Sequence, residues 1–258
     1  MLRKGDLTQG GITGTLLHFT LPMMVGSFLQ QCYNIADTLI VGQCIGAGAL
    51  AAVGSAYTLM VFLISVLLGL AMGSGTVFSL HYGAGNHVAL RRSIFSSFVL
   101  IGIVTLILNV AVFIWLGPIL RLLQVPQDIY GMMHSYLWII FCGIVFTFIY
   151  NFYASLLRAV GDSVTPLWFL AVSVVLNIAL DLFFILQLDW GIQGAAAATV
   201  LAQGVAALGI IIYTYRRRPE LRWHHEDMCF DRTCLKEIAS FSTLTCVQQS
   251  VMNLGILM

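Results

Sequence analysis

The sequence predicts an all-α integral membrane protein with six complete transmembrane helices and the start of a seventh. Hydrophobic residues make up 59% of the 258 residues and charged residues only 9%, whereas soluble domains are about half apolar and about a quarter charged. Long apolar runs recur along the chain, and none shows the alternation that is typical of a transmembrane strand. These observations favour helices in lipid over a barrel or a soluble core.

Each predicted span is a run of about 20 or more mostly apolar residues, the length that crosses the hydrocarbon of a bilayer. The first is too long for the core of a signal peptide, so we expect it to remain as a membrane anchor. Long connections are expected only at 73–92 and 216–236. The six complete runs cover residues 15–43, 49–72, 93–116, 132–157, 164–187 and 191–215, and another begins near residue 237.

The basic residues predict the orientation. All 12 of them except Arg121 lie on one predicted side of the spans. Because positively charged loops stay in the cytoplasm, we expect a multi-pass protein of the cell membrane, the inner membrane of a bacterium, with a cytoplasmic N-terminus. The lipid bilayer is the expected environment, and no interleaved basic and aromatic surface indicates a nucleic-acid partner.

The segment 216–236 is the predicted boundary within the chain, because it is rich in arginine and mixes acids with bases. It separates a six-helix transmembrane lobe at 1–215 from the start of a seventh helix at 237–258. We predict that the segment is a cytoplasmic loop between two lobes.

A faint repeat supports this division. The pair Gln248-Gln249 lies about as far into the seventh helix as Gln30-Gln31 lies into the first. Together with the even block of six helices, this similarity suggests two lobes related by a parallel repeat. The chain is then expected to be a fragment, and a C-terminal lobe is expected in the full-length protein.

Two carboxylates fall inside predicted spans: Asp37 in the first and Asp181 in the fifth. A carboxylate at the centre of a transmembrane helix costs roughly 2.5–3.5 kcal/mol on insertion scales. No lysine or arginine occurs within a span to neutralise either one. Each must therefore be protonated, solvated or bound to a cation, and we predict a cation-coupling site for Na⁺ or H⁺.

Polar side chains share a helix face with each carboxylate. Asn177 precedes Asp181 by one helical turn, on the same side of the helix. The residues that fall on the face of Asp37 are Gln30, Tyr33 and Asn34. Each carboxylate therefore belongs to a polar stripe.

Uncharged polar residues of other spans could converge on the same cavity. These residues are Asn151 in the fourth span and Thr199 and Gln203 in the sixth. The alternative is that they only form hydrogen bonds between helices, which are worth about 1–2 kcal/mol each at most. The sequence leaves both interpretations open.

Proline and glycine mark further positions in the first two spans. Pro22 removes a backbone hydrogen bond, so a kink is expected about four turns before Asp37, either as a gate or as a static bend. The pairs Gly42–Gly46 and Gly69–Gly73 have the small-xxx-small spacing that predicts close helix packing.

Enzyme and cofactor motifs are not found in the sequence. It contains no HExxH, GxSxG or GxxxxGK[ST] pattern, so neither an enzyme nor an ATP-driven pump is indicated. The spacing of His224, His225, Cys229 and Cys234 fits no common zinc site. We expect no cofactor and no structural metal.

Several segments, in family order, resemble the multidrug and toxic compound extrusion (MATE) transporters. The segments are GDLTQGGITGTLLHFTLP, QQCYNIADTLIVG, GALAAVGS, LLRAVGDSVTP, LNIALD and GIQGAAAATVLAQ. The resemblance implies a twelve-helix antiporter of two six-helix lobes around a V-shaped cavity. Such a protein would export organic cations or other toxic, drug-like small molecules against an inward flow of Na⁺ or H⁺.

The resemblance also implies roles for individual residues. Asp37 matches the family's first-helix acid and Asp181 its fifth-helix acid, both implicated in cation coupling. Pro22 matches a first-helix proline whose bending is proposed to accompany proton coupling in some members. The positions that match polar residues around the family's cation site are Gln30, Tyr33, Asn34, Asn151, Asn177 and Thr199.

Two other classes of membrane protein fit the sequence less well. A flippase of related fold for lipid-linked precursors would need buried cations for a pyrophosphate head group, and the predicted spans contain none. A seven-helix receptor would place the N-terminus outside the cell. A light-driven pump would need a lysine within its last helix, and Lys236 lies only at its predicted start.

Overall fold

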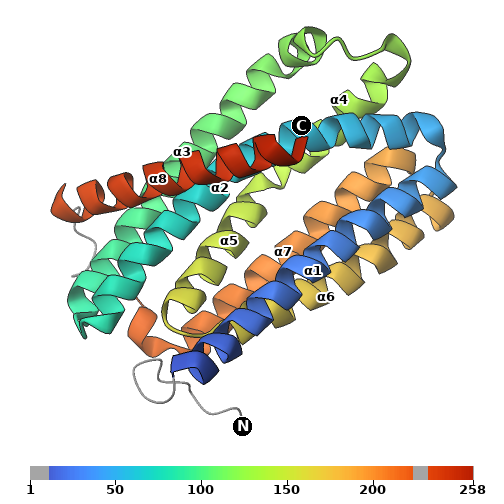
Figure 1. Cartoon of the computed structure of the whole chain (residues 1–258). Helices are drawn as coiled ribbons and strands as arrows, with labels where there is room; N and C mark the ends of the chain where they lie inside the picture. The colour runs from blue at the N-terminus through green and yellow to red at the C-terminus, as the bar shows by residue number, and fades with distance from the viewer. Residues whose placement is uncertain (1–11, 223–231, 258) are drawn as a thin grey trace.

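The computed structural model describes residues 12–222 and 232–257, which form a bundle of long helices without a strand (Figure 1). A π-helical turn, Phe183–Gln187, directly follows α6, and a 3-10 turn, Pro219–Leu221, follows α7. The helices are α1 (Ile12–Cys44), α2 (Ala47–Gly83), α3 (His87–Leu122), α4 (Gln127–Cys142), α5 (Ile144–Ala159), α6 (Val164–Leu182), α7 (Gly191–Arg217) and α8 (Arg232–Leu257). The predicted all-α membrane fold is confirmed.

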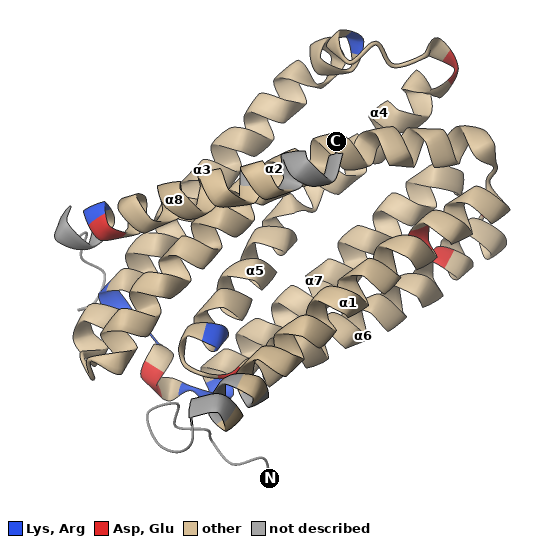
Figure 2. Ribbon diagram, viewed as in Figure 1, with Lys and Arg blue, Asp and Glu red and all other residues tan. Residues whose placement is uncertain are grey.

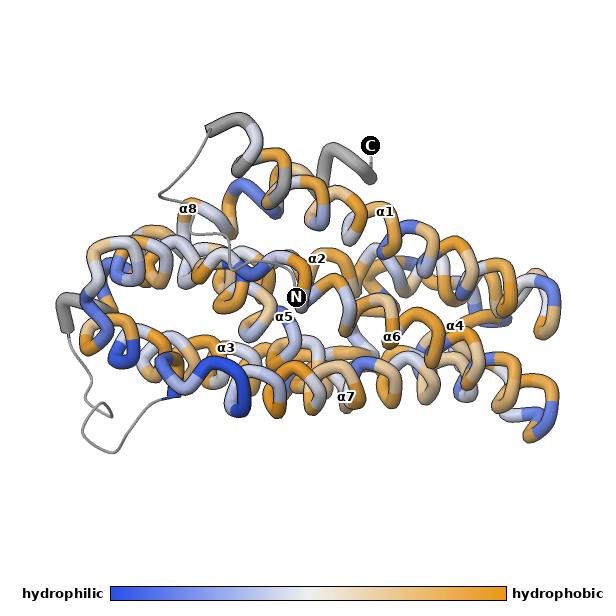
Figure 3. The backbone as a smooth tube through the Cα atoms, turned by 90° about the horizontal axis from the view of Figure 1, so that it is seen from below, coloured by the Kyte–Doolittle hydropathy of each residue, from blue (hydrophilic) through white to orange (hydrophobic). Residues whose placement is uncertain are grey.

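Four single helices of the described residues are long and apolar enough to cross a membrane, and the bent pair α4–α5 adds a fifth when the two helices are counted as one span. The four are α2, α3, α6 with its π-helical end, and α7. Figure 3 shows hydrophobic residues along the helices and hydrophilic residues gathered near several of their ends. The helix α1, expected as a further span, has the required length of 33 residues but is not in this apolar set. A helix of this length is long enough to cross the membrane and supports a sixth span.

The prediction of a long connection at 73–92 is wrong. The helix α2 continues to Gly83, and α3 begins at His87. The sequence Gly-Ser-Gly at 73–75 resembles a loop, but all three residues are buried in the bundle. Small residues there let neighbouring helices approach closely. The helix α2 therefore continues through residues 73–75, although their hydropathy is low.

The span expected as one helix at 132–157 is broken at Gly143. The helices α4 and α5 on either side of this residue are bent by 47° relative to each other. A Cβ atom on Gly143 would collide with the side chain of Val200 on α7. The glycine therefore lets α7 approach the bend, a contact that the local sequence pattern does not reveal.

The helices form two groups around a shared core. The helices α1, α6 and α7 lie side by side, while α2 packs against α3, α4, α5 and α8 (Figure 1). The helix α7 also contacts α4 and α5, which joins the two groups. Fully buried side chains of the core include Leu67 of α2, Phe141 of α4 and Phe152 of α5.

The expected boundary segment 216–236 is partly helical. The helix α7 ends at Arg217, and α8 begins at Arg232, earlier than the expected residue 237. The residues 223–231 lie outside the described part of the chain, and with them His224, His225 and Cys229. The division into a lobe, a cytoplasmic loop and the start of a second lobe stays a prediction.

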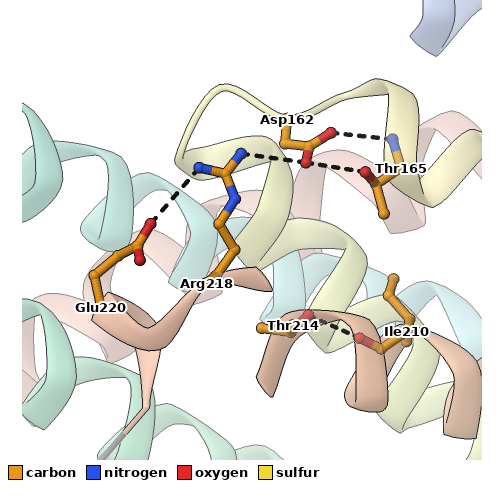
Figure 4. Close-up of polar contacts among 6 residues, drawn as sticks. All are labelled: Asp162, Thr165, Ile210, Thr214, Arg218 and Glu220. Atoms are coloured by element: carbon orange, nitrogen blue, oxygen red, sulfur yellow. Dashed lines mark hydrogen bonds and ion pairs between the residues drawn. The ribbon is translucent and has the colours of Figure 1, made fainter. Parts of the chain in front are cut away.

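An ion-paired cap joins the start of α6 to the end of α7 (Figure 4). One carboxylate oxygen of Asp162 accepts a hydrogen bond from the backbone N–H of Thr165 at 3.0 Å, and the other accepts one from the Thr165 hydroxyl at 2.9 Å. Arg218 donates to the same carboxylate at 3.3 Å and pairs with Glu220 at 3.6 Å. The segment LLRAVGDSVTP thus contains a helix cap that also holds α7.

Replacement of Asp162 with alanine should destabilise the protein by about 1–2 kcal/mol, because the cap is lost and Arg218 keeps only Glu220. The measurement is the thermal midpoint of the purified protein in detergent. Glu220→Gln is the matched control, because it leaves the Asp162 contacts intact and should lower the midpoint less. Equal midpoints for Asp162→Ala and the parent protein would contradict the cap.

Candidate functional site

Two carboxylates lie together inside the helices. Asp37 on α1 is 8% exposed, and Asp181 on α6 is fully buried. The helices α1 and α6 pack against each other, and the two carboxyl groups are close enough to interact directly. Figure 2 shows acidic segments on α1 and α6 within helix interiors that are otherwise uncharged. The fold therefore brings both sequence-predicted acids into one site.

Asn177 connects Asp181 to α7. With its amide nitrogen turned toward Asp181, it donates to a carboxylate oxygen at 2.9 Å, and its own oxygen accepts from the backbone N–H of Thr199 at 3.2 Å. In the opposite orientation the amide donates to the Thr199 hydroxyl at 3.3 Å. A charged carboxylate only accepts hydrogen bonds, so the first orientation suits the site better. Either orientation joins Asn177 to Thr199.

Two tyrosines complete the site. The hydroxyl groups of Tyr33 on α1 and Thr199 on α7 lie 3.3 Å apart. Tyr136 on α4 is 3% exposed and lies within electrostatic range of both carboxylates and of Tyr33. The sequence did not single out Tyr136, because an aromatic residue in an apolar run looks like any other core residue.

The carboxylates are not neutralised by the side chains that the structure describes. No described lysine, arginine or histidine forms an ion pair with Asp37 or Asp181. One oxygen of each, Oδ1 in both residues, is buried without a hydrogen-bond partner among the described atoms. A buried, unpaired carboxylate oxygen is costly. Such oxygens, beside an amide and hydroxyl groups, suit a shared proton or a small hard cation.

The other polar residues predicted for the site lie outside this group. Gln30 is exposed, and Asn34 donates to the side chain of Gln31 at 3.3 Å. The amide of Asn151 donates to the carbonyl of Thr147 on its own helix at 2.8 Å. Gln30 is on the same side of α1 as Asp37 but about 10 Å further along the axis, given the rise of a helix. A shared face alone therefore did not place it at the carboxylates.

A small apolar hollow borders the site between α2, the α4–α5 bend and α7. Its walls include Met60, Ile64 and Val200, and its polar edge includes Gln203 and Thr199. The hydroxyl of Thr147 donates to the Gln203 side chain at 2.5 Å. Because Thr199 contacts both the hollow and the carboxylate group, it connects the two.

Pro22 and the predicted glycine pairs have separate places. The helix α1 is one continuous helix through Pro22, so the gating kink stays a prediction. Gly46 has a φ of 116° and open space around it, so it belongs to the turn between α1 and α2, and its predicted packing role is wrong. The close packing predicted for Gly69 and Gly73 is confirmed by their contacts with α8.

Comparison with known proteins identifies relatives of this chain. The family model MatE matches residues 22–183, which include both carboxylates. The chain is 37% identical over 217 residues to the probable multidrug resistance protein YpnP of Bacillus subtilis (strain 168), covering 84% of this chain and 49% of that protein. It is 31% identical over 210 residues to the multidrug export protein MepA of Staphylococcus saprophyticus, covering 78% of this chain and 45% of that protein. The chain spans about half the length of these curated relatives.

Solved structures show the same fold. An outward-facing multidrug resistance MATE family transporter of the MOP superfamily matches with a TM-score of 0.91 and 24% identity, over 99% of this chain and 57% of that one. An inward-facing conformation of a multidrug resistance MATE family transporter of the MOP superfamily matches with a TM-score of 0.82 and 24% identity. The match covers 93% of this chain and 55% of that one. At this identity the likeness concerns the fold alone. With the family model matching most of α1 to α6, the chain belongs to the MatE family.

Proposed function

We propose that this chain is the N-terminal lobe of a secondary transporter that exports drug-like small molecules in exchange for Na⁺ or H⁺. Members of this family are transporters and not enzymes. The observation that carries the proposal is the buried pair Asp37 and Asp181, each with an unpartnered oxygen. The curated relatives named for multidrug resistance and export support the substrate class. A second lobe, expected in the full-length protein, would supply the other wall of the cavity.

The carboxylate pair gives the proposed exchange a physical basis. Asp37 and Asp181 lie on different helices, so two bare charges would repel each other across the α1–α6 contact. A bound cation or proton removes this repulsion and stabilises the packed arrangement. If substrate binds better to the other arrangement, ion binding lowers the affinity for substrate, and substrate binding lowers the affinity for the ion. This reciprocal linkage is antiport.

The surroundings of the site favour uncharged or cationic organic substrates. The helix faces beside the carboxylates are mainly apolar, with Met60 and Ile64 lining a hollow that, at about 20 Å³, is itself too small for an organic molecule. Among the described residues, lysine and arginine lie near the helix ends and not beside the carboxylates (Figure 2). A pyrophosphate head group would be repelled here, so the flippase of related fold is not favoured.

The proposed location is the cell membrane, with the N-terminus in the cytoplasm. The basic ends of α3, α5 and α7 carry Arg91, Arg158 and Arg217, and Figure 2 shows basic segments gathered at this end of the bundle. Basic segments favour the cytoplasmic side of a membrane. A tag at the N-terminus that is labelled only after the cell is permeabilised would support this orientation.

The test of the proposed function is efflux under separately imposed gradients. Cells that express the full-length protein are loaded with a fluorescent organic cation, and either an inward Na⁺ gradient or an inward H⁺ gradient is applied. One of the two gradients should accelerate dye loss above the rate of cells without the protein. Dye loss that responds to neither gradient would contradict ion-coupled export.

The hydroxyl of Thr199 offers a finer test of the site. Thr199→Val keeps the shape of the side chain but removes the hydroxyl contact with Tyr33, so ion-driven efflux should fall about tenfold. Thr199→Ser is the matched control, because it retains the hydroxyl and should retain most of the efflux. Equal efflux from the two variants would exclude a role for the hydroxyl.

A further inference from the structure

A strip of partly exposed apolar side chains runs between α3 and α7. Both helices pack on α5, and among the described residues they make little contact with each other. The strip comprises Phe98 of α3, Ile149 of α5, and Ile211 and Tyr215 of α7, which all pack against one buried cluster. We call it the α3–α7 strip.

The α3–α7 strip is long enough for a lipid chain. On α7, Tyr215 and Ile211 are followed toward the middle of the helix by Leu208 and Leu201, which are exposed and lie on the same helix face. The distance from Tyr215 to Leu201 is about 21 Å at the rise of a helix. The hydrocarbon of one leaflet is roughly 15 Å deep. One acyl chain therefore has room along this face of α7.

A small hollow lies at the basic end of the α3–α7 strip, where α3, α5, α7 and the 3-10 turn meet. Its lining includes Ile94 of α3, Leu221 of the 3-10 turn, Tyr215 and Arg222. Tyr153 of α5 is buried there and interacts with the side chain of Tyr215. Tyrosine is typical of the depth at which lipid head groups begin. The hollow therefore marks the level of the head groups.

The guanidinium group of Arg222 turns back onto the end of α7. Its Nε donates to the main-chain carbonyl of Tyr215 at 2.7 Å, and a terminal nitrogen donates to the same carbonyl. These two contacts leave three of the five N–H donors of an arginine for another partner. No described carboxylate forms an ion pair with Arg222, because Glu220 pairs with Arg218. The exposed charge of Arg222 is therefore held in place at the hollow.

A second arginine lies on the α3 side of the hollow. Arg91 precedes Ile94 by one helical turn, on the same face of α3. The 3-10 turn, which directly precedes Arg222, contacts α3 as well as α7. Figure 2 shows the basic segments of α3 and α7 at the same end of the bundle. Positive charge thus borders the apolar strip from both sides.

The geometry points to a binding site for an anionic phospholipid between α3 and α7. The phosphate group of the lipid binds at Arg222 and Arg91, and one acyl chain lies along the α3–α7 strip. Arginine suits a phosphate because its planar N–H donors bind two oxygens at once. Basic pockets between transmembrane helices on the cytoplasmic side bind such head groups. A zwitterionic lipid carries a cation that both arginines repel, and a free anion gains nothing from the strip.

Lipid binding to the purified full-length protein tests this site. The delipidated protein in detergent is titrated with phosphatidylglycerol or with phosphatidylethanolamine, and the bound fraction is measured by native mass spectrometry. Phosphatidylglycerol should bind about tenfold more tightly, because hydrogen bonds between charged groups are the stronger ones. Equal affinities for the two lipids would overturn the proposal.

Substitutions of Arg222 test the head-group contact. Arg222→Gln should weaken the binding of phosphatidylglycerol about tenfold, while Arg222→Lys keeps the charge and should weaken it less. Arg121→Gln is the matched control, because Arg121 is exposed in the last turn of α3, at the opposite end of that helix from Arg91. Binding to Arg222→Gln that equals binding to the parent protein would overturn the proposal.

Two further measurements distinguish a lipid from free phosphate. Leu208→Trp fills the α3–α7 strip and should weaken the binding of phosphatidylglycerol about fivefold. Val205→Trp is the matched control, because Val205 is also exposed but shares a helix face with Gly209, which meets Phe169 of α6. An excess of inorganic phosphate should not displace the lipid. Displacement by phosphate, or full binding to Leu208→Trp, would indicate a site for anions alone and overturn the proposal.

This proposal goes beyond the proposed function, because lipid binding requires neither an ion gradient nor a substrate. A protein that exports no dye under any gradient would contradict ion-coupled export and leave the lipid titrations to decide the site. A protein that exports dye but binds both lipids equally would contradict only the lipid site.

Discussion

Asp181→Asn should abolish ion-driven efflux while leaving membrane insertion intact. The substitution keeps the shape of the side chain but removes its charge, and with it the ability to hold a proton or cation beside Asp37. Coupling free energies of about 1–3 kcal/mol correspond to changes of about 5- to 150-fold, and a change at the upper end is expected for a fully buried group. The measurement is dye efflux under the gradient that drives the parent protein, normalised to the amount of protein in the membrane.

Asp37→Asn should have the same effect, because the two carboxylates act as one site. Asp189→Asn is the matched control. Asp189 is exposed beyond the π-helical turn and has a φ of 52°, a conformation that asparagine also tolerates. The control should therefore retain efflux. Efflux like that of the parent protein in both Asp37→Asn and Asp181→Asn would exclude the coupling site.

Gly143→Ala should destabilise the protein by about 1–3 kcal/mol, the usual cost of an overpacked contact. The added methyl group collides with Val200, so either the α4–α5 bend or α7 must shift. Because Val200 is adjacent to Thr199, a shift of α7 would also disturb the carboxylate site. The thermal midpoint in detergent and the yield of membrane-inserted protein should both fall.

A second substitution tests the cause of this loss. Val200→Ala makes room for the methyl group, so the double variant Gly143→Ala with Val200→Ala should be more stable than Gly143→Ala alone. Gly131→Ala on α4 is the matched control, because a Cβ at that position meets nothing within 4 Å. If the effects of Gly143→Ala and Val200→Ala simply add, the collision is not the cause.

The sequence predicted the helices well and their interruptions poorly. Long apolar runs reveal where spans lie, and the observed ranges of α6 with its π-helical end and of α7 agree closely with 164–187 and 191–215. The bend at Gly143 was not predicted, because its cause is Val200 on a distant helix. The extension of α2 through 73–75 was missed for a related reason, since small residues look like a loop until their packing partners are known.

The candidate site was predictable where one helix or one charge defined it. Asp37 and Asp181 stand out because a carboxylate is costly inside lipid, and Asn177 follows from helical spacing. Tyr136 was not predictable, because nothing in its own run of sequence distinguishes it from a core residue. Gln30 shows the limit of a helix-face argument, which gives the direction of a side chain but not the depth at which a neighbouring helix meets it.

The most direct test of the central claim is ion movement driven by substrate alone. The purified full-length protein is placed in liposomes with equal Na⁺ and H⁺ on both sides, and a gradient of dye is imposed across the membrane. Dye movement should drive Na⁺ or H⁺ in the opposite direction, and Asp37→Asn with Asp181→Asn should remove this ion flow. Dye that crosses the membrane through the protein without ion movement, or ion movement that persists in the double variant, would contradict the account.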